Sequence, residues 1–407
     1  MLNQNNIPLH ARKKRLLFYE LVPKIRHKNA LVITGMRQVG KTVLMRQLFE
    51  EVLNSPKLWF DLENPLDQKV FEDIDYHNIY ERLRKTAHAT SAERLFVFID
   101  EIQNFPEITK IIKFLIDHYQ VKFIVTGSSN YYLKNLFPES LAGRKFLYQL
   151  PPLSFSEILF FKDVLSLDEI KKMTLADILQ PRSIIDHAKR QEHYEEYLQF
   201  GGFPEVVITP DSTTKRQIIK NIFASFFEKD LKLLSDYTDA KELRDLILLL
   251  VPRVGSLVDV TKLASELRVT RAKVYGYLEF LQGIFFIRLL PRYSKSIDRS
   301  VAAGKKIYFT DSGILTTAGA VNDAQLFENT VVNQLGAYGD VSFYNHRNQE
   351  EIDILLDKTI ALEVKLTGTP ADIVHVEKLA RKLGLSDWYV VSKKSTEHIK
   401  LLSPLFF

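Results

Sequence analysis

The stretch that decides the fold is ALVITGMRQVGKTVLMRQL, from Ala30 to Leu48. Its apolar, β-branched start predicts a buried strand, and the apolar positions after Thr42 recur at helical spacing. Between the two lies the pattern GxxxxGKT, Gly35 to Thr42, whose glycines let backbone N–H groups approach phosphate oxygens at a helix N-terminus. Strand, loop and helix together predict a phosphate-binding loop in an α/β domain.

The same loop predicts a nucleotide site for ATP with Mg²⁺. Lys41 is placed to reach the β and γ phosphates, and the Thr42 hydroxyl can ligate Mg²⁺. The expected nucleotide contacts of the loop and the helix start are Gly35, Gln38, Val39, Gly40, Lys41, Thr42 and Val43. A chance glycine turn before a helix is the alternative.

A second apolar run, RLFVFIDEIQN (Arg94 to Asn104), ends in two acids, Asp100 and Glu101. The run is typical of a parallel strand buried on both faces, with polar groups at its carboxyl end. Asp100 is therefore expected in the Mg²⁺ shell, and Glu101 is placed to polarise an attacking water. A helix N-cap is the alternative for these acids.

Two further segments carry candidate residues of the same site. VKFIVTGSSN ends a third strand in polar groups, of which Ser128 and Asn130 are candidate sensors of the γ-phosphate; a capped turn is the alternative. In ESLAGRKF, Arg144 is suited to reach the nucleotide of a neighbouring subunit, because a guanidinium stabilises charge on phosphates. A solvated arginine is equally compatible with the pattern.

Taken together, GMRQVGKT, FVFIDEIQN, VTGSSN and SLAGR resemble the AAA-type ATPases of the archaeal and bacterial AAA_14 class. Further on, GGFPEVV, FFEKDL and IYFTDSGIL resemble the DUF4143-type C-terminal half of such proteins, which has a nuclease-like tail. The resemblance implies that Lys41, Thr42, Asp100 and Glu101 serve ATP hydrolysis. It also implies a sensor at Ser128 or Asn130 and an arginine finger at Arg144. A finger acting in trans requires a homo-oligomer, for which a hexamer is one candidate.

The middle of the chain predicts a helical lid followed by a winged helix. In GGFPEVV, Gly201 to Val207, the glycines and proline predict a turn after a helix, with an interdomain hinge as the alternative. Three amphipathic segments, AKELRDLILLLV, DVTKLASELR and VTRAKVYGYLEFLQG, then precede two short apolar strands, which is the order of a winged helix. The candidate DNA contacts lie at the start of the third helix and in the wing: Arg271, Lys273, Tyr275, Arg288, Arg292, Lys295 and Arg299. A protein-docking spacer is the alternative.

The segment EIDILLDKTIALEVK, Glu351 to Lys365, predicts a β-hairpin around a loop at residues 357–359. Keeping its apolar faces together pairs Leu356 with Ile360 and Ile354 with Leu362. The same register sets Asp353 opposite Glu363, and two opposed like charges destabilise a sheet unless a cation lies beside them.

The hairpin and the amphipathic helix before it resemble the restriction-endonuclease-like core. That resemblance implies Glu328, Asp353 and Glu363 as ligands of Mg²⁺ or Mn²⁺, and Lys365 as the group that orients or deprotonates a metal-bound water. Two alternatives stay open, a binding-only relic of the nuclease fold and a plain salt-bridged hairpin.

Length and composition bound these expectations. A chain of 407 residues, 46% of them hydrophobic, is long enough for two or three domains. We expect an AAA-type P-loop core with a parallel sheet at 1–150, a helical lid and linker at 151–236, a winged helix at 237–312 and a restriction-endonuclease-like α/β domain at 313–407. The absence of cysteine and of any apolar run near 18 residues favours a soluble, cytoplasmic protein without a membrane partner. DNA is the expected partner, and the net charge of +5 requires its contacts to come from local patches.

Overall fold

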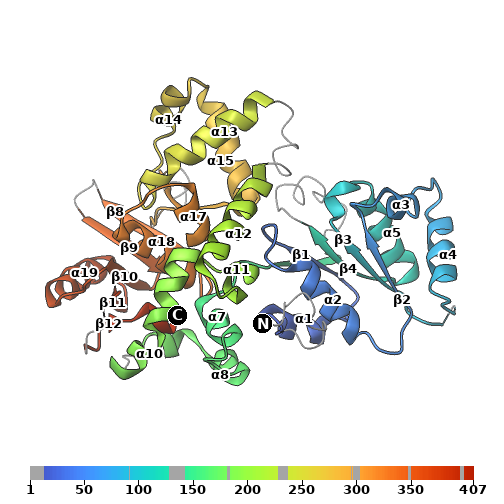
Figure 1. Ribbon diagram of the computed structural model, residues 1–407, viewed down its shortest axis with the longest axis horizontal. Coiled ribbons are helices and arrows are strands. Elements are labelled where there is room, and N and C mark those ends of the chain that lie inside the picture. Colours follow the sequence, from blue (N-terminus) through green and yellow to red (C-terminus); the bar gives the residue numbers. More distant parts are fainter. Residues whose placement is uncertain are drawn as a thin grey trace. The chain divides into compact units, whose positions relative to one another are not determined.

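The structure is a computed structural model, and it describes residues 13–90, 92–127, 143–180, 184–227, 237–294, 296, 303–346, 350–394 and 398–407 (Figure 1). Two compact units make up the chain. The first comprises the residues up to Pro151 together with Gly283–Phe285, and the second comprises Pro152–Gln282 and Phe286–Phe407.

The first unit contains a five-stranded parallel sheet in the order β2-β3-β4-β1-β5, which confirms the expected α/β fold. Its strands are β1 (Ala30–Thr34), β2 (Lys57–Asp61), β3 (Phe96–Asp100), β4 (Lys122–Gly127) and β5 (Lys145–Gln149). Every residue of β1, β3 and β4 is buried, as expected of parallel strands covered on both faces. Because the strands are parallel, the polar residues that follow them meet at one edge of the sheet.

Helices cover this sheet and are coloured blue to cyan in Figure 1. They are α1 (Leu16–Leu21), α2 (Lys41–Glu51), α3 (Pro65–Lys69), α4 (Tyr76–Thr86) and α5 (Ile108–Tyr119), with 3₁₀ turns η3 (Val22–Lys24) and η4 (Ile102–Asn104). One core cluster joins α4 and α5 to the strands, through residues such as Ile79, Ile112 and Val97. Burial of this cluster fixes the strand ends that carry the candidate ATP site.

The second unit begins with helices, which the sequence assigned to a lid and linker. They are α7 (Phe155–Phe161), α8 (Leu167–Lys172), α9 (Leu175–Ile178), α10 (Ile184–Phe200), α11 (Pro204–Ile208) and α12 (Ser212–Ser225). Ser154 and Ser166 each form a capping box with a glutamate three residues later, which fixes where α7 and α8 begin. The helix α10 ends before Gly201, whose φ of 73° is the turn that its sequence predicted.

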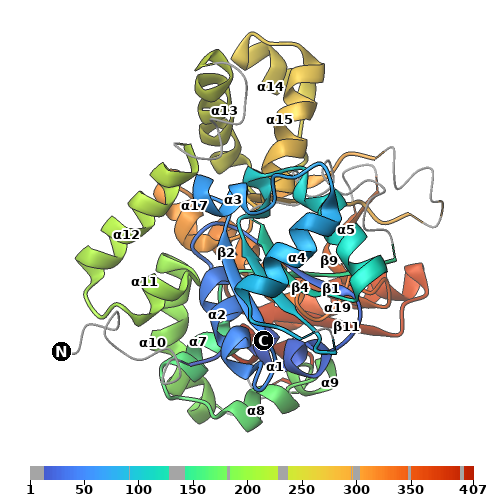
Figure 2. The same cartoon turned by 90° about the vertical axis from the view of Figure 1, so that its right-hand side faces the viewer.

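Three helices and a strand pair follow, in the order of a winged helix. They are α13 (Tyr237–Leu250), η7 (Val251–Arg253), α14 (Val260–Leu267), α15 (Arg271–Gly283), β6 (Ile287–Leu290) and β7 (Lys306–Phe309). Figure 2 shows α13, α14 and α15 gathered together. The strands β6 and β7 pair antiparallel, and the Thr270 hydroxyl accepts a hydrogen bond from the Lys273 backbone N–H at the start of α15.

The remaining elements form a second five-stranded sheet, in the order β12-β11-β10-β9-β8. They are α17 (Ser312–Ala318), α18 (Asp323–Leu335), β8 (Val341–His346), β9 (Glu350–Leu356), β10 (Ile360–Lys365), α19 (Pro370–Leu383), β11 (Asp387–Ser392), β12 (Leu401–Leu402) and η8 (Pro404–Phe406). The antiparallel pairs Ile360 with Leu356 and Leu362 with Ile354 confirm the expected hairpin register. On its other side β10 runs parallel to β11.

A buried aspartate joins two segments that lie far apart in the sequence of the second unit. Asp311 caps α17 by accepting a hydrogen bond from the Ile314 N–H at 3.0 Å. It also accepts one from the Gly202 N–H at 2.8 Å, in the turn after α10. The segments GGFPEVV and IYFTDSGIL therefore contact each other through the Gly202 N–H and the Asp311 carboxylate.

Candidate functional site

The phosphate-binding loop has the backbone that its glycines allow. Gly35 has φ 152° and Gly40 has φ 94°, and Gly40 is the N-cap of α2. A Cβ on Gly35 would lie 2.2 Å from the Leu150 carbonyl oxygen, so no side chain fits there. Gln38 also has a positive φ, of 62°. The loop thus presents the N-terminus of α2 to a ligand, as the sequence pattern predicts.

Lys41 and Thr42 lie at the start of α2, where their side chains have different partners. The Lys41 ammonium donates to the carbonyl oxygens of Gly35, at 3.0 Å, and of Met36, at 2.8 Å. These bonds hold the Lys41 side chain against the phosphate-binding loop. Its ammonium group therefore lies where it can contact an anion bound by the loop. Thr42 Oγ1 donates to Asp100 Oδ2 at 2.7 Å.

Asp100 connects the ends of β3 and β4 to the start of α2. It ends β3, accepts a hydrogen bond from Thr42 after β1, and accepts another from the Thr126 hydroxyl on β4. Burial raises the pKa of the Asp100 carboxyl, while the Thr126 and Thr42 hydrogen bonds act in the opposite direction. A buried carboxylate beside a threonine hydroxyl fits Mg²⁺, which binds one or two such groups and keeps phosphate oxygens and waters as its other ligands.

Glu101 follows directly and has a strained backbone. Its φ is 54°, in the left-handed region that a residue with a side chain rarely adopts. The Glu101 N–H donates to Thr126 Oγ1 at 3.2 Å, and its carboxylate accepts a hydrogen bond from the Gln103 amide. Thr126 and Gln103 thus position both acids. The sequence predicted Thr126 only as one of the polar groups that could sense the γ-phosphate, and it gave Gln103 no role.

Arg15 is a further residue of this site that sequence reasoning missed. Its guanidinium is buried and donates to the Val39 carbonyl in the phosphate-binding loop at 3.0 Å. A second bond, of 2.9 Å, reaches the Pro151 carbonyl. The only signal in the sequence was a basic run, which does not tell a buried arginine from a solvated one.

The remaining predicted ATP-site residues lie elsewhere. Arg144 precedes β5 and forms an ion pair with Asp117 at the end of α5, and its carbonyl accepts from Ala30 at the start of β1. It therefore lies at the N-terminal ends of the strands, whereas the phosphate-binding loop follows the C-terminal end of β1. Ser128 and Asn130 lie outside the described residues.

Several candidate DNA contacts of the expected winged helix have partners inside the second unit. The Lys273 ammonium pairs with Asp239, at 2.9 Å, and with Glu242, at 2.6 Å. Arg288 packs against Gly336, and burial lowers the pKa of its guanidinium. Arg292 donates to the Asn345 carbonyl.

Lys273, Arg288 and Arg292 thus each contact neighbouring elements of the second unit, and their contact with DNA stays a prediction. Arg271 is exposed, and Tyr275 is 55% exposed. Lys295 and Arg299 lie outside the described residues.

The C-terminal carboxylates gather around two lysines. Lys306 on β7 is only 5% exposed and pairs with Glu351 at 2.5 Å, with the Glu328 carboxylate at 3.9 Å. Lys365 pairs with Glu363 at 2.8 Å, and the Asp353 carboxylate accepts the Val364 N–H at 2.9 Å. The cation that the hairpin register required is thus supplied by side chains.

The charges in this cluster are incompletely compensated. Burial, and then the Asp353 charge, raises the pKa of Glu328 and of Glu363 to about 7. Burial also raises the pKa of Asp353 itself, against the lowering effect of Lys306. Among the described atoms, Glu363 Oε2 is buried without a hydrogen-bond partner.

The expected metal site of this cluster has no support from the geometry. Among the described residues, no group of three or more His, Asp or Glu side chains is placed to hold a metal ion. Lys306, which sequence reasoning did not assign to the site, takes up the charge of Glu351 and lies beside Glu328. A metal-bound water at Lys365 therefore remains only a prediction.

Two sequence families match parts of the chain. Residues 27–159 match a family described as an AAA domain, and residues 191–325 match a domain of unknown function, DUF8612. The second match corrects the DUF4143-type assignment. The first match agrees with the P-loop and the parallel sheet of this part of the chain.

Relatives extend along most of the chain but are uncharacterized. A protein of Methanocaldococcus jannaschii is 26% identical over 396 residues, which cover 93% of this chain and 84% of the relative. One of Haemophilus influenzae is 26% identical over 379 residues, covering 88% and 89%.

Solved structures resemble the chain only loosely. The Aeropyrum pernix Orc1 protein in complex with DNA has a TM-score of 0.32 and 14% identity, covering 78% of this chain and 92% of that one. The Thermotoga maritima RuvB Holliday junction branch migration motor has a TM-score of 0.29 and 17% identity, covering 68% and 88%. Within the described part of the chain, no helix is long and apolar enough to span a bilayer.

Proposed function

We propose that the protein is a Mg²⁺-dependent ATPase that couples hydrolysis to the binding, translocation or remodelling of DNA, for example of branched DNA. The observation that carries the ATPase part is the hydrogen-bonded set of Thr42, Asp100 and Thr126, which joins the start of α2 to the ends of β3 and β4 beside the phosphate-binding loop. A merely structural turn has no need for a buried carboxylate at that position.

The residues of the site divide the work of hydrolysis. The loop amides and Lys41 hold the phosphates, and Thr42 with Asp100 would hold Mg²⁺, which when bound neutralises charge on the β and γ phosphates. Glu101 orients and polarises the attacking water. Arg144 lies at the N-terminal ends of the strands, away from its own phosphate-binding loop. It is therefore suited to contact the nucleotide of a neighbouring subunit, and that role requires a homo-oligomer.

The DNA part of the proposal rests on the winged helix. Arg271 and Tyr275 lie exposed in the first two turns of α15, the segment that enters a major groove in proteins of this kind. An arginine there can contact a phosphate or a guanine, and an exposed tyrosine can stack or donate a hydrogen bond.

The test of the ATPase replaces Glu101 by Gln, which keeps the shape and removes the base. ATP binding should persist, and turnover should fall by about 10² to 10⁴, the usual contribution of a positioned base. Glu107→Gln, at an exposed acid six residues on, is the matched control and should hydrolyse normally. Normal turnover in Glu101→Gln would remove Glu101 from the mechanism.

The test of the DNA coupling measures turnover with linear, forked and four-way duplexes over a range of salt. Stimulation that weakens steeply as salt rises is the expected result, because phosphate contacts release counterions. Turnover indifferent to all three substrates would refute a DNA-driven motor.

A second candidate is a nucleotide-dependent switch that docks a protein partner and uses the nuclease-like domain as a silent scaffold. The observation that favours it is the pairing of the C-terminal carboxylates with Lys306 and Lys365. The parent, Asp353→Ala and Glu363→Ala should all leave labelled DNA intact in Mn²⁺. Cleavage by the parent that both variants lose would contradict the scaffold and restore the nuclease.

A further inference from the structure

A further acid lies at the end of the sheet that carries the candidate ATP site. Asp61 is the last residue of β2, as Asp100 is the last residue of β3, and the two are partners in the parallel register of these strands. Because the strands are parallel, both acids lie at their carboxyl ends, where the phosphate-binding loop follows β1. Sequence patterns gave Asp61 no role, because they did not predict β2.

Asp61 and Asp100 lie on the same face of the sheet. Two residues earlier on each strand, Trp59 and Phe98 contact the Phe49 ring of α2, with centroid distances of 6.0 and 5.0 Å. Side chains two residues apart on a strand share a face, so the two acids lie on the face that α2 covers. The same helix begins at the phosphate-binding loop, and its first turn is hydrogen-bonded to Asp100. Asp61 therefore faces the side of the sheet on which a nucleotide would bind.

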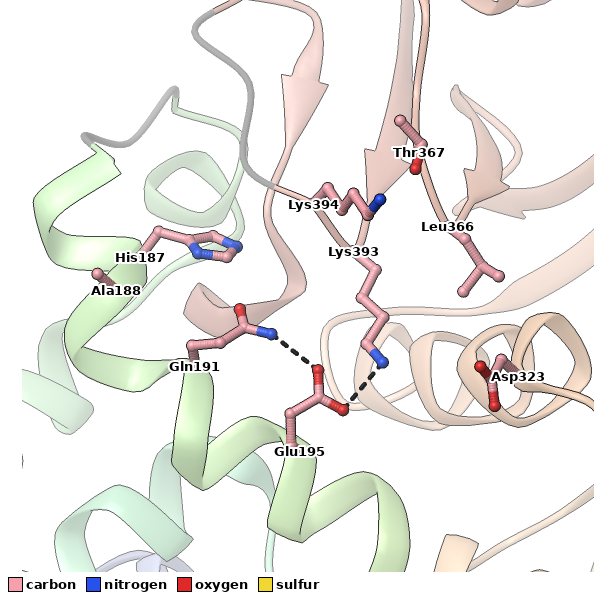
Figure 3. Close-up of a pocket in the computed structure, with 9 residues that line it drawn as sticks. All are labelled: His187, Ala188, Gln191, Glu195, Asp323, Leu366, Thr367, Lys393 and Lys394. Carbon is pink, nitrogen blue, oxygen red and sulfur yellow. Dashed lines mark hydrogen bonds and ion pairs between the residues drawn. The ribbon is translucent and has the colours of Figure 1, made fainter.

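The negative charge of Asp61 acts on Asp100 and is not compensated. Burial is the main cause that raises the pKa of Asp100, and the charges of Glu101 and Asp61 raise it further. Among the described residues, neither Asp61 nor Asp100 forms an ion pair with a lysine or an arginine. By contrast, Glu195 beside a cavity in the second unit accepts a hydrogen bond from the Lys393 ammonium at 2.9 Å (Figure 3). The unpaired charge at the ends of β2 and β3 attracts a cation.

Hydrogen bonds fix Asp61 and leave one of its oxygens free. Its N–H donates to Asp67 Oδ2 at 2.7 Å, and its Oδ1 accepts from the Glu63 N–H at 2.9 Å. The Leu62 N–H donates to the Asp100 carbonyl at 3.1 Å, which joins the two strand ends. Asp61 Oδ2 has no partner among the described residues, and the residue is only partly buried. This oxygen is available to a ligand.

We propose that Asp61 is a Mg²⁺-positioning residue of the ATP site, a role that rests on the proposed ATPase function. Mg²⁺ binds one or two carboxylates directly and keeps several waters. Thr42 and Asp100 are the direct ligands that the geometry offers, and the free oxygen of Asp61 accepts hydrogen bonds from the waters of the cation. Loss of such an outer acceptor weakens metal binding about 10- to 100-fold.

The experiment compares the full chain with Asp61→Asn, in which the amide oxygen can still accept the Glu63 N–H and only the charge is lost. Mn²⁺, which prefers the same oxygen ligands as Mg²⁺, is titrated with and without ADP and followed by electron paramagnetic resonance. The ADP-dependent binding, corrected for binding to free ADP, reports the ATP site, because any Mn²⁺ at the C-terminal carboxylates is bound in both titrations. Asp61→Asn should weaken this binding about tenfold or more.

The affinity for ADP without metal separates this role from a structural one. In EDTA, Asp61→Asn should bind ADP at least as tightly as the parent, because a negative charge near the phosphates has been removed. Equal losses of ADP binding in EDTA and of Mn²⁺ binding would show that Asp61 only holds the fold, and they would overturn the proposal.

Two more variants complete the comparison. Glu72→Gln is the matched control, because it removes an exposed acid of the same unit away from the strand ends, and it should keep the Mn²⁺ affinity of the parent. Asp61→Glu restores the charge and should recover part of the affinity that Asp61→Asn loses. The proposal is overturned if Asp61→Asn binds Mn²⁺ as tightly as Glu72→Gln does. A parent that binds no ADP would contradict the ATPase function itself, which distinguishes the two failures.

Discussion

Replacement of Asp311 by alanine should destabilise the second unit strongly. The carboxylate accepts the buried N–H groups of Gly202, at 2.8 Å, and of Ile314, at 3.0 Å, and alanine supplies no acceptor for either. Each orphaned N–H costs about 1–3 kcal/mol, and the relief of a buried charge offsets part of the loss. We expect a decrease of roughly 2–4 kcal/mol in the free energy of unfolding at neutral pH.

The pH dependence of this decrease has a definite sign. Burial raises the pKa of Asp311 to about 6 in the folded protein, against 3.8 for the ordinary carboxyl. A raised folded-state pKa gives stability that is present at low pH and lost as the pH rises through about 6. The destabilisation by Asp311→Ala should therefore be about 1 kcal/mol larger at pH 5 than at pH 7.5.

The two tryptophans make the assay specific. Trp59 lies in the first unit and Trp388 in the second, so in a Trp59→Phe background urea unfolding followed by fluorescence reports the second unit alone. Asp259→Ala, which removes the exposed cap of α14, is the matched control and should cost about 0.5–2 kcal/mol. If Asp311→Ala costs no more than this control, the buried contact with Gly202 contributes nothing and the reasoning is refuted.

Three further outcomes follow from the same structure. Gly201→Ala should lower the free energy of unfolding by more than about 2 kcal/mol, because its Cβ would lie 2.2 Å from Asp311 Oδ1. Gly384→Ala is the control: Gly384 has a similar φ of 76° and open space, so the change should cost only about 1 kcal/mol of backbone strain. Equal losses of stability for the two variants in urea unfolding would contradict this. Lys122 is buried, which lowers its pKa to about 7, so the unfolded first unit binds more protons between about pH 7 and 10 and its stability should rise with pH there. Lys122→Met should flatten that rise in the Trp59 signal of a Trp388→Phe background, and an unchanged slope would rule out Lys122 as its source. Arg15→Gln should weaken ATP binding about tenfold, measured with a fluorescent analogue, because a charged hydrogen bond to the loop is worth about 1.5–3 kcal/mol; unaltered affinity would show that Arg15 only packs.

Local sequence patterns were sufficient for much of the fold. The two-residue period of strands and the 3.6-residue period of helices are properties of short segments, and they predicted the P-loop, the three helices with their strand pair, and the hairpin register. The register pair of Leu356 with Ile360 followed because a slip of one residue would turn the apolar face to water. The backbone conformations of Gly35 and Gly40 were equally predictable, since their positions need φ values that few other residues adopt.

The sites depended on contacts that no local pattern contains. The sequence placed Lys273, Arg288 and Arg292 on a DNA-facing surface because they are basic and near a wing, yet each has a partner within the second unit. Charge alone could not predict these internal partners, because the sequence of a basic residue is the same whether its side chain faces solvent or pairs with an acid inside the protein.

The sequence by itself determined the strand, loop and helix of the phosphate-binding site and the strand that ends in Asp100, but it did not predict β2, which lies between them in the chain. Only the tertiary structure decided that Arg15 supports the phosphate-binding loop, that Asp311 holds Gly202, and that Lys306 lies among the C-terminal carboxylates. The physical reason is that these contacts join residues far apart in the sequence. Gly202 and Asp311 are 109 residues apart, and such pairs form where packing of whole elements brings buried donors and acceptors together.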